Sequence, residues 1–418
     1  MKVCVIGLGY IGLPTAAMFA NAGLDVVGVD KKPQIVEALN RGEVIIEENG
    51  LEEFIKNVVA GGHLKAALEP EVSDAYIISV PTPITEDKKA DMRFVESATK
   101  SLVPLLKKGD LVILESTSPI GTVDQLMLPI LEESGLKAGE DFSLGHSPER
   151  VIPGKILYEL VNNDRIAGGI DKKSASRIAE LYKSFVKGEI FETDARTAEM
   201  CKLSENTFRD VNIAFANELA KICEDQGINV WELIELCNKH PRVNIHQPGP
   251  GVGGHCIAVD PWFIVEKEPS LANIIRTSRE TNDSMPDYVA SKADKILEGI
   301  ENPAICVLGV TYKPDVDDMR ESPVIHLIEK LKEKGYAVKA HDPHVKGREG
   351  IEEDLAAAAK GADLVILGVN HSQYKALDFG LLAESVRTKN FLDTRNFSDM
   401  EAAKAAGFAC HLLGRTER

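Results

Sequence analysis

The N-terminal segment combines a buried strand with a glycine-rich turn, and this pairing constrains the fold more than any other feature of the chain. An apolar run over residues 3–6 leads into Gly7-Leu8-Gly9-Tyr10-Ile11-Gly12, and a helix-like run covers 13–22. In such a loop the first glycine makes a tight turn, the second lets the backbone approach a pyrophosphate, and the third lets the helix pack closely on the strand. The order of strand, glycine loop and helix predicts a doubly wound domain.

A second strand-like run at 25–29 ends on an acidic residue, Asp30. A carboxylate at this point accepts hydrogen bonds from ribose hydroxyls and repels a 2′-phosphate, so the pattern predicts NAD as the cofactor. The alternative is a glycine turn that is only structural. The complete set of flanking elements favours the dinucleotide site.

Polar loops follow two later strand-like runs of the same segment. Residues 75–80 precede Pro81-Thr82-Pro83, and residues 111–115 precede Ser116-Thr117-Ser118-Pro119. Loops at the carboxyl ends of parallel strands line the ligand crevice, although simple helix caps are the other interpretation of these residues. The expected cofactor contacts are Gly7, Gly9, Tyr10, Ile11, Gly12, Asp30, Pro81, Thr82, Ser116 and Thr117.

Charge and cysteine usage exclude several classes of protein. A formal net charge of −17 over 418 residues disfavours a broad nucleic-acid interface. The seven cysteines are scattered without the spacing of a zinc site or a disulfide framework, so we expect no metal and a reducing cytoplasm. The chain has no uninterrupted apolar run long enough for a membrane span, and we expect no targeting segment.

A long helix is predicted over residues 195–227, about nine turns in length. Lys202, Asn206 and Arg209 lie at positions i, i+4 and i+7 and so project from one face. Such a face is usually solvated. A second helix is predicted at 230–238, and it is followed by the segment His240-Pro241-Arg242. This segment leads directly into a loop of glycines that ends on a cysteine. A helix this long between two α/β domains also offers a dimer surface.

That loop, Pro248-Gly249-Pro250-Gly251-Val252-Gly253-Gly254-His255-Cys256, presents one thiol on a glycine-dense backbone. Glycines let the main chain approach a ligand, and a thiolate there is a candidate nucleophile. A packed, inert cysteine beside a tight turn is the alternative. Asp260 follows four residues later.

The last third of the chain repeats the α/β pattern. Strand-like runs at 304–310 and 336–341 flank a helix-like run at 324–334, and the loop between, 311–323, carries Lys313 and Arg320. These side chains suit a phosphate ester. The predicted fold is therefore α/β, with two Rossmann-like doubly wound parallel-sheet domains joined by a central helical region; the expected boundaries are 1–193, 194–298 and 299–418.

Taken in order, these motifs resemble the UDP-glucose/GDP-mannose dehydrogenases, NAD-dependent four-electron oxidases of nucleotide sugars. The resemblance covers essentially the whole chain and rests on the Gly7 to Gly12 loop with Asp30, 116–119, Pro148-Glu149-Arg150, 202–206, 251–260 and 311–323. It implies an NAD-binding Rossmann domain, a central helical dimerisation domain carrying the cysteine loop, and a C-terminal UDP-binding domain. It further implies a cytoplasmic homodimer or higher homo-oligomer that binds a UDP-sugar and neither nucleic acid nor membrane.

The chemistry of such an oxidation requires two hydride transfers, with an aldehyde held midway. Attack by the Cys256 thiolate gives a thiohemiacetal, loss of the second hydride gives a thioester, and water releases the acid. The resemblance implies that Lys202 stabilises the oxyanion and takes part in proton transfer, and that Asn206 orients water or donates a hydrogen bond. It implies that Asp260 is a base or orients water. Glu149 with Thr117 is the implied group for activating the hydrolytic water.

The residues implied to bind the nucleotide sugar are Glu149, Arg150, Val151, Lys202, Asn206, Arg209, His240, Arg242, Gly253, Tyr312, Lys313 and Arg395. Arg320 is expected to bind the nucleotide sugar or the cofactor, and Arg242 is expected to reach across a dimer. For each arginine the alternative is a surface salt bridge.

Within this family the segment from His255 to Phe263 is most similar to the UDP-N-acetyl-D-mannosamine dehydrogenases. Glucose-oxidising relatives usually carry serine before the cysteine and lysine shortly before the aspartate, where this chain has His255 and Val259. UDP-N-acetylglucosamine and then UDP-glucose are the alternative substrates. A two-electron dehydrogenase of the β-hydroxyacid type is the alternative class, against which Cys256 and the 313–320 segment argue. A non-catalytic nucleotide-binding protein would be expected to lack the glycine loop, the cysteine or the lysine, and this chain lacks none of them.

Overall fold

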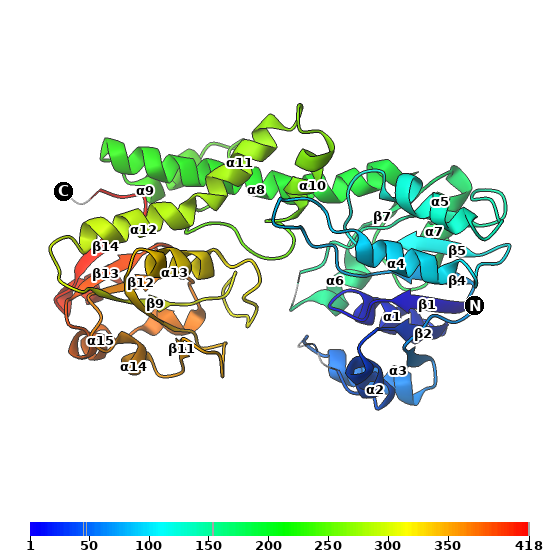
Figure 1. Ribbon diagram of the computed structural model, residues 1–418, viewed down its shortest axis with the longest axis horizontal. Helices are drawn as coiled ribbons and strands as arrows, with labels where there is room; N and C mark the ends of the chain where they lie inside the picture. Colours follow the sequence, from blue (N-terminus) through cyan, green and yellow to red (C-terminus); the bar gives the residue numbers. More distant parts are fainter. Residues whose placement is uncertain (45, 47, 153, 417–418) are drawn as a thin grey trace. The chain divides into compact units, whose positions relative to one another are not determined.

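A computed structural model describes residues 1–44, 46, 48–152 and 154–416. The chain divides into two compact units (Figure 1). The first comprises residues 1–205 with 266–268, and the second comprises 206–265 with 269–418. Each unit has its own sheet, so each is described by itself.

The first unit is built on a sheet with strand order β3-β2-β1-β4-β5-β6-β7-β8. All neighbouring pairs are parallel except β6 and β7, so the two final strands run opposite to the rest. The strands are β1 Lys2–Ile6, β2 Asp25–Val29, β3 Leu64–Ala67, β4 Ala75–Ile78, β5 Leu111–Leu114, β6 Ser143–His146, β7 Arg165–Gly169 and β8 Ile190–Asp194. The order reverses direction at β1, whose neighbours are β2 and β4.

The strands of this sheet are apolar on both faces because helices cover both. On β1, Val3 and Val5 join the core formed with helices α1, α3 and α7, while Cys4 and Ile6 join the core formed with α4 and η1. This alternation is the reason that the strand reads as one continuous apolar run. The helices of the unit are α1 Gly12–Asn21, α2 Pro33–Asn40, α3 Leu51–Ala60, α4 Arg93–Leu102, the π-helix η1 Thr122–Met127, α5 Leu128–Glu132, α6 Ile156–Asn162 and α7 Lys172–Tyr182.

The second unit contains a six-stranded, all-parallel sheet of order β11-β10-β9-β12-β13-β14. Its strands are β9 Ala304–Leu308, β10 Ala337–His341, β11 Ile351–Glu352, β12 Leu364–Leu367, β13 Asn390–Asp393 and β14 Ala409–Leu412. Ile305 and Val307 pack with α12 and α13, while Cys306 and Leu308 pack with α14 and α15 on the opposite face. Apart from the long helix described next, the helices are α9 Val230–Cys237, α11 Asn273–Asp283, α12 Met285–Ile296, α13 Pro323–Glu333, α14 Leu355–Ala359, α15 Phe379–Ser385, α16 Met400–Ala405 and the short 3₁₀ segment η2 Ser372–Ala376.

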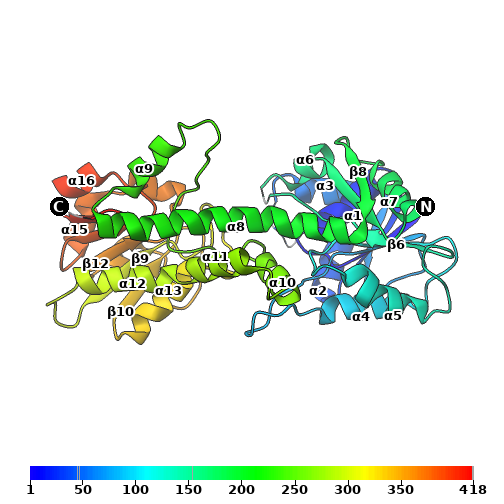
Figure 2. The same ribbon diagram turned by 90° about the horizontal axis from the view of Figure 1, so that it is seen from above.

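The predicted long helix is α8, Ala195–Gln226, with 32 residues (Figure 2). Both α8 and the short α10, Asp260–Lys267, contribute residues to the two units. The predicted fold class, two doubly wound α/β domains with a long helix, is confirmed. None of the helices in the described part of the chain is both long and apolar enough to cross a membrane.

Candidate active site

The glycine loop between β1 and α1 has the geometry that a bound pyrophosphate requires. Gly7 has a φ of +97°, and a Cβ built there would lie 2.2 Å from the carbonyl oxygen of Ser79. A Cβ on Gly12 would lie 1.9 Å from the Gly7 carbonyl oxygen, whereas no atom of the described residues lies within 4 Å of a Cβ on Gly9. The first and third glycines are therefore required by packing, and the second leaves open backbone for a ligand.

Asp30 lies at the carboxyl end of β2, beside this loop. Its carboxylate accepts hydrogen bonds from the backbone N–H of Leu8 at 3.1 Å and of Lys32 at 2.9 Å, and the residue is partly exposed. These bonds fix the acceptor next to the glycine turn, where the ribose of a dinucleotide is held in Rossmann domains.

The polar loops after β4 and β5 are joined by hydrogen bonds. Thr82 Oγ1 donates to the Thr117 carbonyl oxygen at 2.6 Å, and Ser116 Oγ donates to the Val80 carbonyl oxygen at 2.8 Å. Both loops leave the carboxyl edge of the sheet beside the point where the strand order reverses. The first unit therefore gathers the predicted cofactor contacts at a switch point, where α/β sheets bind ligands.

Glu149, in the loop after β6, is held by two hydrogen bonds. One carboxylate oxygen accepts from Arg165 Nη1 at 2.6 Å and the other accepts from the Arg150 backbone N–H at 2.6 Å. Arg165 is 4% exposed and opens strand β7. The direction of the Glu149 carboxylate is thus set by a buried guanidinium.

Arg150 and Lys202, two further residues implied to bind substrate, also belong to the first unit. Arg150 Nη1 donates to Glu205 of α8 at 2.9 Å, and its Nη2 donates to the carbonyl oxygen of Asp164. Arg150 lines a pocket of about 460 Å³ with Asn162, Asn163, Asp164 and Glu205. Lys202 is partly buried on α8, and Val151, which follows Arg150 in the chain, is also partly buried.

In the second unit, Asn206 of α8 and Asp260 form a buried pair. Asn206 Nδ2 donates to Asp260 Oδ2 at 2.5 Å, and the two residues are 7% and 2% exposed. Asp260 is the first residue of α10, and its backbone N–H donates to the Cys256 carbonyl oxygen at 2.8 Å. The hydrogen-bonded turn from Cys256 to Asp260 therefore connects the thiol-bearing residue to the Asn206 amide.

The glycine and cysteine loop is anchored at its start by a chain of buried amides. The Gly249 N–H donates to Asn217 Oδ1 at 2.9 Å, and Asn217 Nδ2 donates to Asn282 Oδ1 at 2.9 Å. Asn282 in turn donates to the Asp210 carboxylate at 2.8 Å, which also accepts from Arg279 at 2.5 Å. All of these side chains are buried, so α8 and α11 hold the start of the loop through a connected set of buried polar groups.

The end of the same loop lies directly against the segment after β9. A Cβ on Gly253 would lie 2.3 Å from the Glu321 carbonyl oxygen, and one on Gly254 would lie 2.9 Å from the Tyr312 ring. The Gly254 N–H donates to the Arg320 carbonyl oxygen at 3.2 Å. Glycine is therefore required here for close approach, and the second unit brings Gly253 and Gly254 against the segment that carries Tyr312 and Arg320.

Three cationic residues in loops of the second unit are associated with the glycine and cysteine loop. Arg395 lies beside it, and Lys313 and Arg320 belong to the segment that contacts it. A Cβ on Gly249 would lie 2.5 Å from Arg395 Nη1, and Arg395 Nε donates to the Gly368 carbonyl oxygen at 3.1 Å. Burial lowers the pKa of Arg395 to about 10. Arg320 makes a two-pronged ion pair with Asp318, and Lys313 Nζ lies 5.9 Å from the Tyr312 ring centre.

His371, which follows β12, anchors the segment that carries Lys313 and Arg320. Its Nδ1 accepts from the Asp315 backbone N–H at 2.9 Å, and its Nε2 lies 2.9 Å from the Asp342 carboxylate. With His344 and Asp315 it forms a group whose ligand atoms lie within 4.8 Å of one another. Both ring nitrogens of His371 already bond to protein groups, so this cluster is explained as a loop anchor.

Arg209, His240 and Arg242 are exposed. Within the His240 to Arg242 segment, the Arg242 N–H donates to His240 Nδ1 at 3.3 Å. Their expected contacts with substrate stay predictions.

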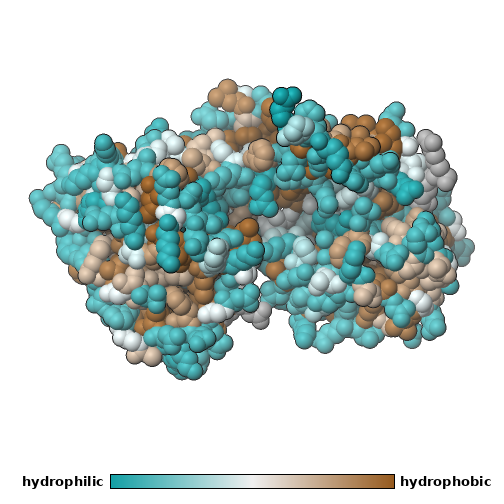
Figure 3. Space-filling view, turned by 180° about the vertical axis from the view of Figure 1, so that it is seen from behind, coloured by the Kyte–Doolittle hydropathy of each residue, from teal (hydrophilic) through white to brown (hydrophobic). Residues whose placement is uncertain are grey.

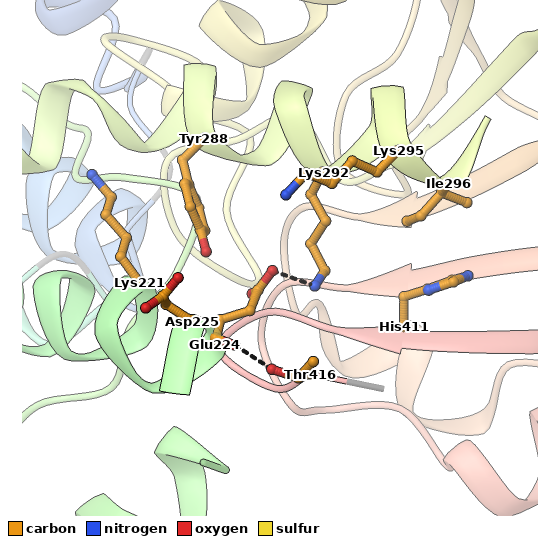
Figure 4. A pocket seen from close by; sticks show the side chains of 9 residues that line it. All are labelled: Lys221, Glu224, Asp225, Tyr288, Lys292, Lys295, Ile296, His411 and Thr416. Atoms are coloured by element: carbon orange, nitrogen blue, oxygen red, sulfur yellow. Dashed lines mark hydrogen bonds and ion pairs between the residues drawn. The ribbon is translucent and has the colours of Figure 1, made fainter. Parts of the chain in front are cut away.

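A separate pocket of about 640 Å³ lies between the end of α8, helix α12 and the C-terminal strand β14 (Figure 4). An ion pair of 2.8 Å between Lys292 and Glu224 spans it, and Tyr288 and Lys221 flank that pair. The lining residues are Lys221, Glu224, Asp225, Tyr288, Lys292, Lys295, Ile296, His411 and Thr416. It contains no residue predicted from the sequence to bind cofactor or substrate.

Sequence reasoning missed the buried residues that hold the site. Arg165, Arg279 and His371 belong to this group, and each pairs with a carboxylate far away in sequence. A charged residue at the start of the buried strand β7 was the available signal for Arg165. Nothing local marks the partners, because they meet only in the folded chain.

Comparison with known proteins identifies the family. Models of the UDP-glucose/GDP-mannose dehydrogenase family match residues 1–186 with its NAD binding domain, 196–284 with its central domain and 306–400 with its UDP binding domain. The UDP-N-acetyl-D-mannosamine dehydrogenase of Methanocaldococcus jannaschii is 47% identical over 419 residues, covering 99% of this chain and 96% of that protein.

Two further relatives bear on the substrate. An NDP-N-acetyl-D-galactosaminuronic acid dehydrogenase of Ralstonia nicotianae is 45% identical over 408 residues, covering 94% of this chain and 95% of that protein. The solved structure of a UDP-D-ManNAc dehydrogenase from Pyrococcus horikoshii superposes with a TM-score of 0.94 at 41% identity, covering 99% of each chain. The predicted family and NAD as cofactor are confirmed: this chain belongs to the UDP-glucose/GDP-mannose dehydrogenase family and is an NAD-dependent nucleotide-sugar dehydrogenase.

Proposed function

We propose that the protein oxidises the C6 hydroxymethyl group of a UDP-N-acetylhexosamine to the carboxylate, with UDP-N-acetyl-D-mannosamine as the preferred substrate and two NAD reduced per sugar. The observation that carries the proposal is the buried Asn206–Asp260 pair, joined by one backbone turn to Cys256. A cysteine one hydrogen-bonded turn from a fixed carboxylate and amide suits covalent capture of an aldehyde.

When it is bound at the Gly7 to Gly12 loop, NAD would accept the hydride in each of the two oxidations. The Cys256 thiolate attacks the C6 aldehyde to form a thiohemiacetal, which after the second oxidation is a thioester. Water then attacks the acyl carbon, the carbon–sulfur bond breaks, and the thiolate of Cys256 is regenerated. Each intermediate stays attached to substrate or enzyme, so the aldehyde does not escape.

The remaining residues act on protons and charge. Lys202 stabilises the oxyanion at C6, and Asn206 donates a hydrogen bond to it or orients water; one positioned donor of this kind contributes about 3 kcal/mol. Asp260 accepts the proton released from the hydroxymethyl group or orients water, and Glu149 with Thr117 activates the water that cleaves the thioester.

The nucleotide sugar is bound by Glu149, Arg150, Val151, Lys202, Asn206, Arg209, His240, Arg242, Gly253, Tyr312, Lys313 and Arg395, with Arg320 at the nucleotide or the cofactor. Planar guanidinium groups bind phosphate oxygens in pairs, which suits a diphosphate. The 2-acetamido group is supported by His255 and Val259 and by the names of the mannosamine and galactosaminuronic acid relatives.

A panel of UDP-sugars tests this function. We expect kcat/KM for UDP-N-acetyl-D-mannosamine to exceed that for UDP-N-acetylglucosamine and UDP-glucose by at least about tenfold, because a pocket built to hydrogen-bond one group rejects analogues that lack or misplace it. NADH formation with purified protein is the measurement. A clear preference for UDP-N-acetylglucosamine or UDP-glucose would correct the sugar, and no NADH with any UDP-sugar would refute the function.

We also infer three domains with boundaries at 1–193, 194–298 and 299–418, and a location in the cytoplasm. None of the seven cysteines, all of which lie in the described part of the chain, forms a disulfide, which supports a reducing compartment. Limited proteolysis tests the boundaries, since cuts clustered well inside these segments would contradict them. Fractionation of the source cells tests the location, and recovery outside the cytoplasm would contradict it.

We infer that the chain assembles as a homodimer or higher oligomer through α8, with Arg242 of one subunit reaching the site of the other. Phe208, Phe215 and Ile222 lie seven residues apart on α8 and are 66%, 51% and 50% exposed. Figure 3 shows hydrophobic side chains at its upper right, over the end of the second unit where α8 and α9 lie. Apolar residues that recur at every seventh position of a helix form a stripe that packs against another helix.

Replacing Phe215 with glutamate is expected to dissociate this assembly, because the substitution places a charge in the middle of the stripe. Light scattering should show the mass of a single chain for the variant and at least twice that for the parent. The matched substitution Leu381→Glu, at another exposed apolar residue, should leave the mass unchanged. A parent protein that elutes as a single chain would contradict the proposal.

A further inference from the structure

Arg165 occupies the centre of a buried polar network in the first unit. Its Nη1 donates to Glu149 at 2.6 Å, its Nη2 donates to Glu115 at 2.6 Å, and its Nε donates to Ser147 Oγ at 2.9 Å. The guanidinium carbon lies 3.7 Å from the centre of the Tyr182 ring. The side chain is 5% exposed, so every face of this cation is bonded or packed.

The second carboxylate of the network, Glu115, is fixed independently. It accepts hydrogen bonds from Tyr182 Oη at 2.9 Å and from Thr15 Oγ1 at 3.2 Å, and its side chain is fully buried. Burial raises the pKa of Glu115 to about 7, with the charge of Arg165 opposing the rise. Burying a charged carboxylate costs free energy, so the presence of Glu115 here points to a function at the site more than to stability.

Within the first unit, the network connects the helix that follows the glycine loop with the loop that carries Glu149. Thr15 belongs to α1, the helix that follows the glycine loop, and Glu149 lies in the loop after β6. A rigid path of hydrogen bonds therefore runs from α1 through Glu115 and Arg165 to the Glu149 carboxylate. The second oxygen of Glu149 accepts a hydrogen bond from the backbone N–H of Arg150.

We propose that Arg165 is the positioning residue for Glu149 in the release of the acid, and that Glu115 in turn fixes Arg165. This inference rests on the proposed function, in which Glu149 acts as the general base for hydrolysis of the thioester. Glu149 takes a proton from water, the water oxygen bonds to the acyl carbon, and the thiolate of Cys256 leaves. A general base must stand within hydrogen-bond reach of its water, and the fork of Arg165 sets the angle of the carboxylate.

Arg165→Lys keeps the charge but cannot donate to Glu149, Glu115 and Ser147 together. We expect uronate release to slow at least about tenfold, since a positioned base contributes about a hundredfold or more. The first NADH of a rapid-mixing experiment should form at the parental rate. Intact-mass analysis of quenched enzyme should therefore show an acyl adduct on Cys256 that the parent does not accumulate.

A double-mutant cycle with Glu149→Gln separates positioning from a structural role. If Arg165 acts through Glu149, Arg165→Lys costs nothing further in the Glu149→Gln background. Arg177→Lys is the matched control, because Arg177 bonds to Gly109, Asp110 and Ser143 of the same sheet without touching Glu149. This control should keep the parental rates.

The proposal is overturned if Arg165→Lys slows the first NADH and uronate release by the same factor, or costs as much in the Glu149→Gln background as in the parent. Should Arg165→Lys fail to fold, Glu115→Gln is measured instead: slower release with an unchanged first NADH supports the proposal, and parental release overturns it. A parental enzyme that forms no NADH with UDP-sugars refutes the proposed function itself, before any variant is compared.

Discussion

Cys256→Ser is expected to abolish formation of the uronate, with a loss of at least about a thousandfold. A serine hydroxyl is a far weaker nucleophile than a thiolate, and a serine ester could form only after the hydroxyl lost its proton. Binding of NAD should be unchanged, because the glycine loop and Asp30 lie in the first unit while Cys256 lies in the second. Chromatography of the sugar products over time provides the measurement.

Cys237→Ser supplies the control for this substitution. Cys237 ends α9 and, like Cys256, is a partly exposed cysteine outside any disulfide. The control should keep the parental rate, which shows that loss of an ordinary thiol is harmless. Full uronate formation by Cys256→Ser would remove the thioester from the mechanism.

Asp260→Ala is expected to lower kcat about a hundredfold or more, with a smaller effect on KM for the UDP-sugar. The substitution removes the acceptor of the 2.5 Å hydrogen bond from Asn206 and leaves that buried amide unpaired. It also removes the carboxylate nearest in sequence to the Cys256 thiol. Steady-state kinetics with saturating NAD measures both constants.

Asp260 is the first residue of α10, so its replacement by alanine also removes a negative charge that stabilises the start of this helix. This effect on the helix must be distinguished from the loss of the carboxylate from the reaction. Asp260→Asn keeps a polar side chain there, and Asp287→Ala removes an acid from the first turn of α12. We expect Asp260→Asn to lose activity nearly as fully as Asp260→Ala and Asp287→Ala to lose none. A fully active Asp260→Asn variant would show that the carboxylate takes no part in the reaction.

The fold was predictable because its strongest signals are local. The run at 25–29 is a strand with the predicted bounds, and the long helix ends one residue before the predicted 227. The antiparallel pairing of β6 with β7 was not predicted, since apolar strand patterns carry no direction. Helices α11 and α12 were not predicted individually, because polar residues dominate α11 and its buried face consists of Ser278, Arg279 and Asn282.

The site was predictable where glycine spacing or a motif marks it. The Gly253 and Gly254 positions have the close approaches that their lack of a side chain suggests, and Asn206 lies on the predicted helix. The partners that hold these groups were not predictable. Asn206 meets Asp260 across 54 positions, and Arg165 meets Glu115 across 50, so only tertiary structure joins them.

The central claim is a four-electron oxidation with a covalent intermediate on Cys256, and counting NADH against sugar tests it most directly. Purified protein, a limiting amount of UDP-N-acetyl-D-mannosamine and excess NAD are allowed to react to completion. We predict two NADH for each sugar consumed, with uronate as the only sugar product. One NADH for each sugar, with an aldehyde or ketone as the product, would contradict the account and indicate a two-electron dehydrogenase.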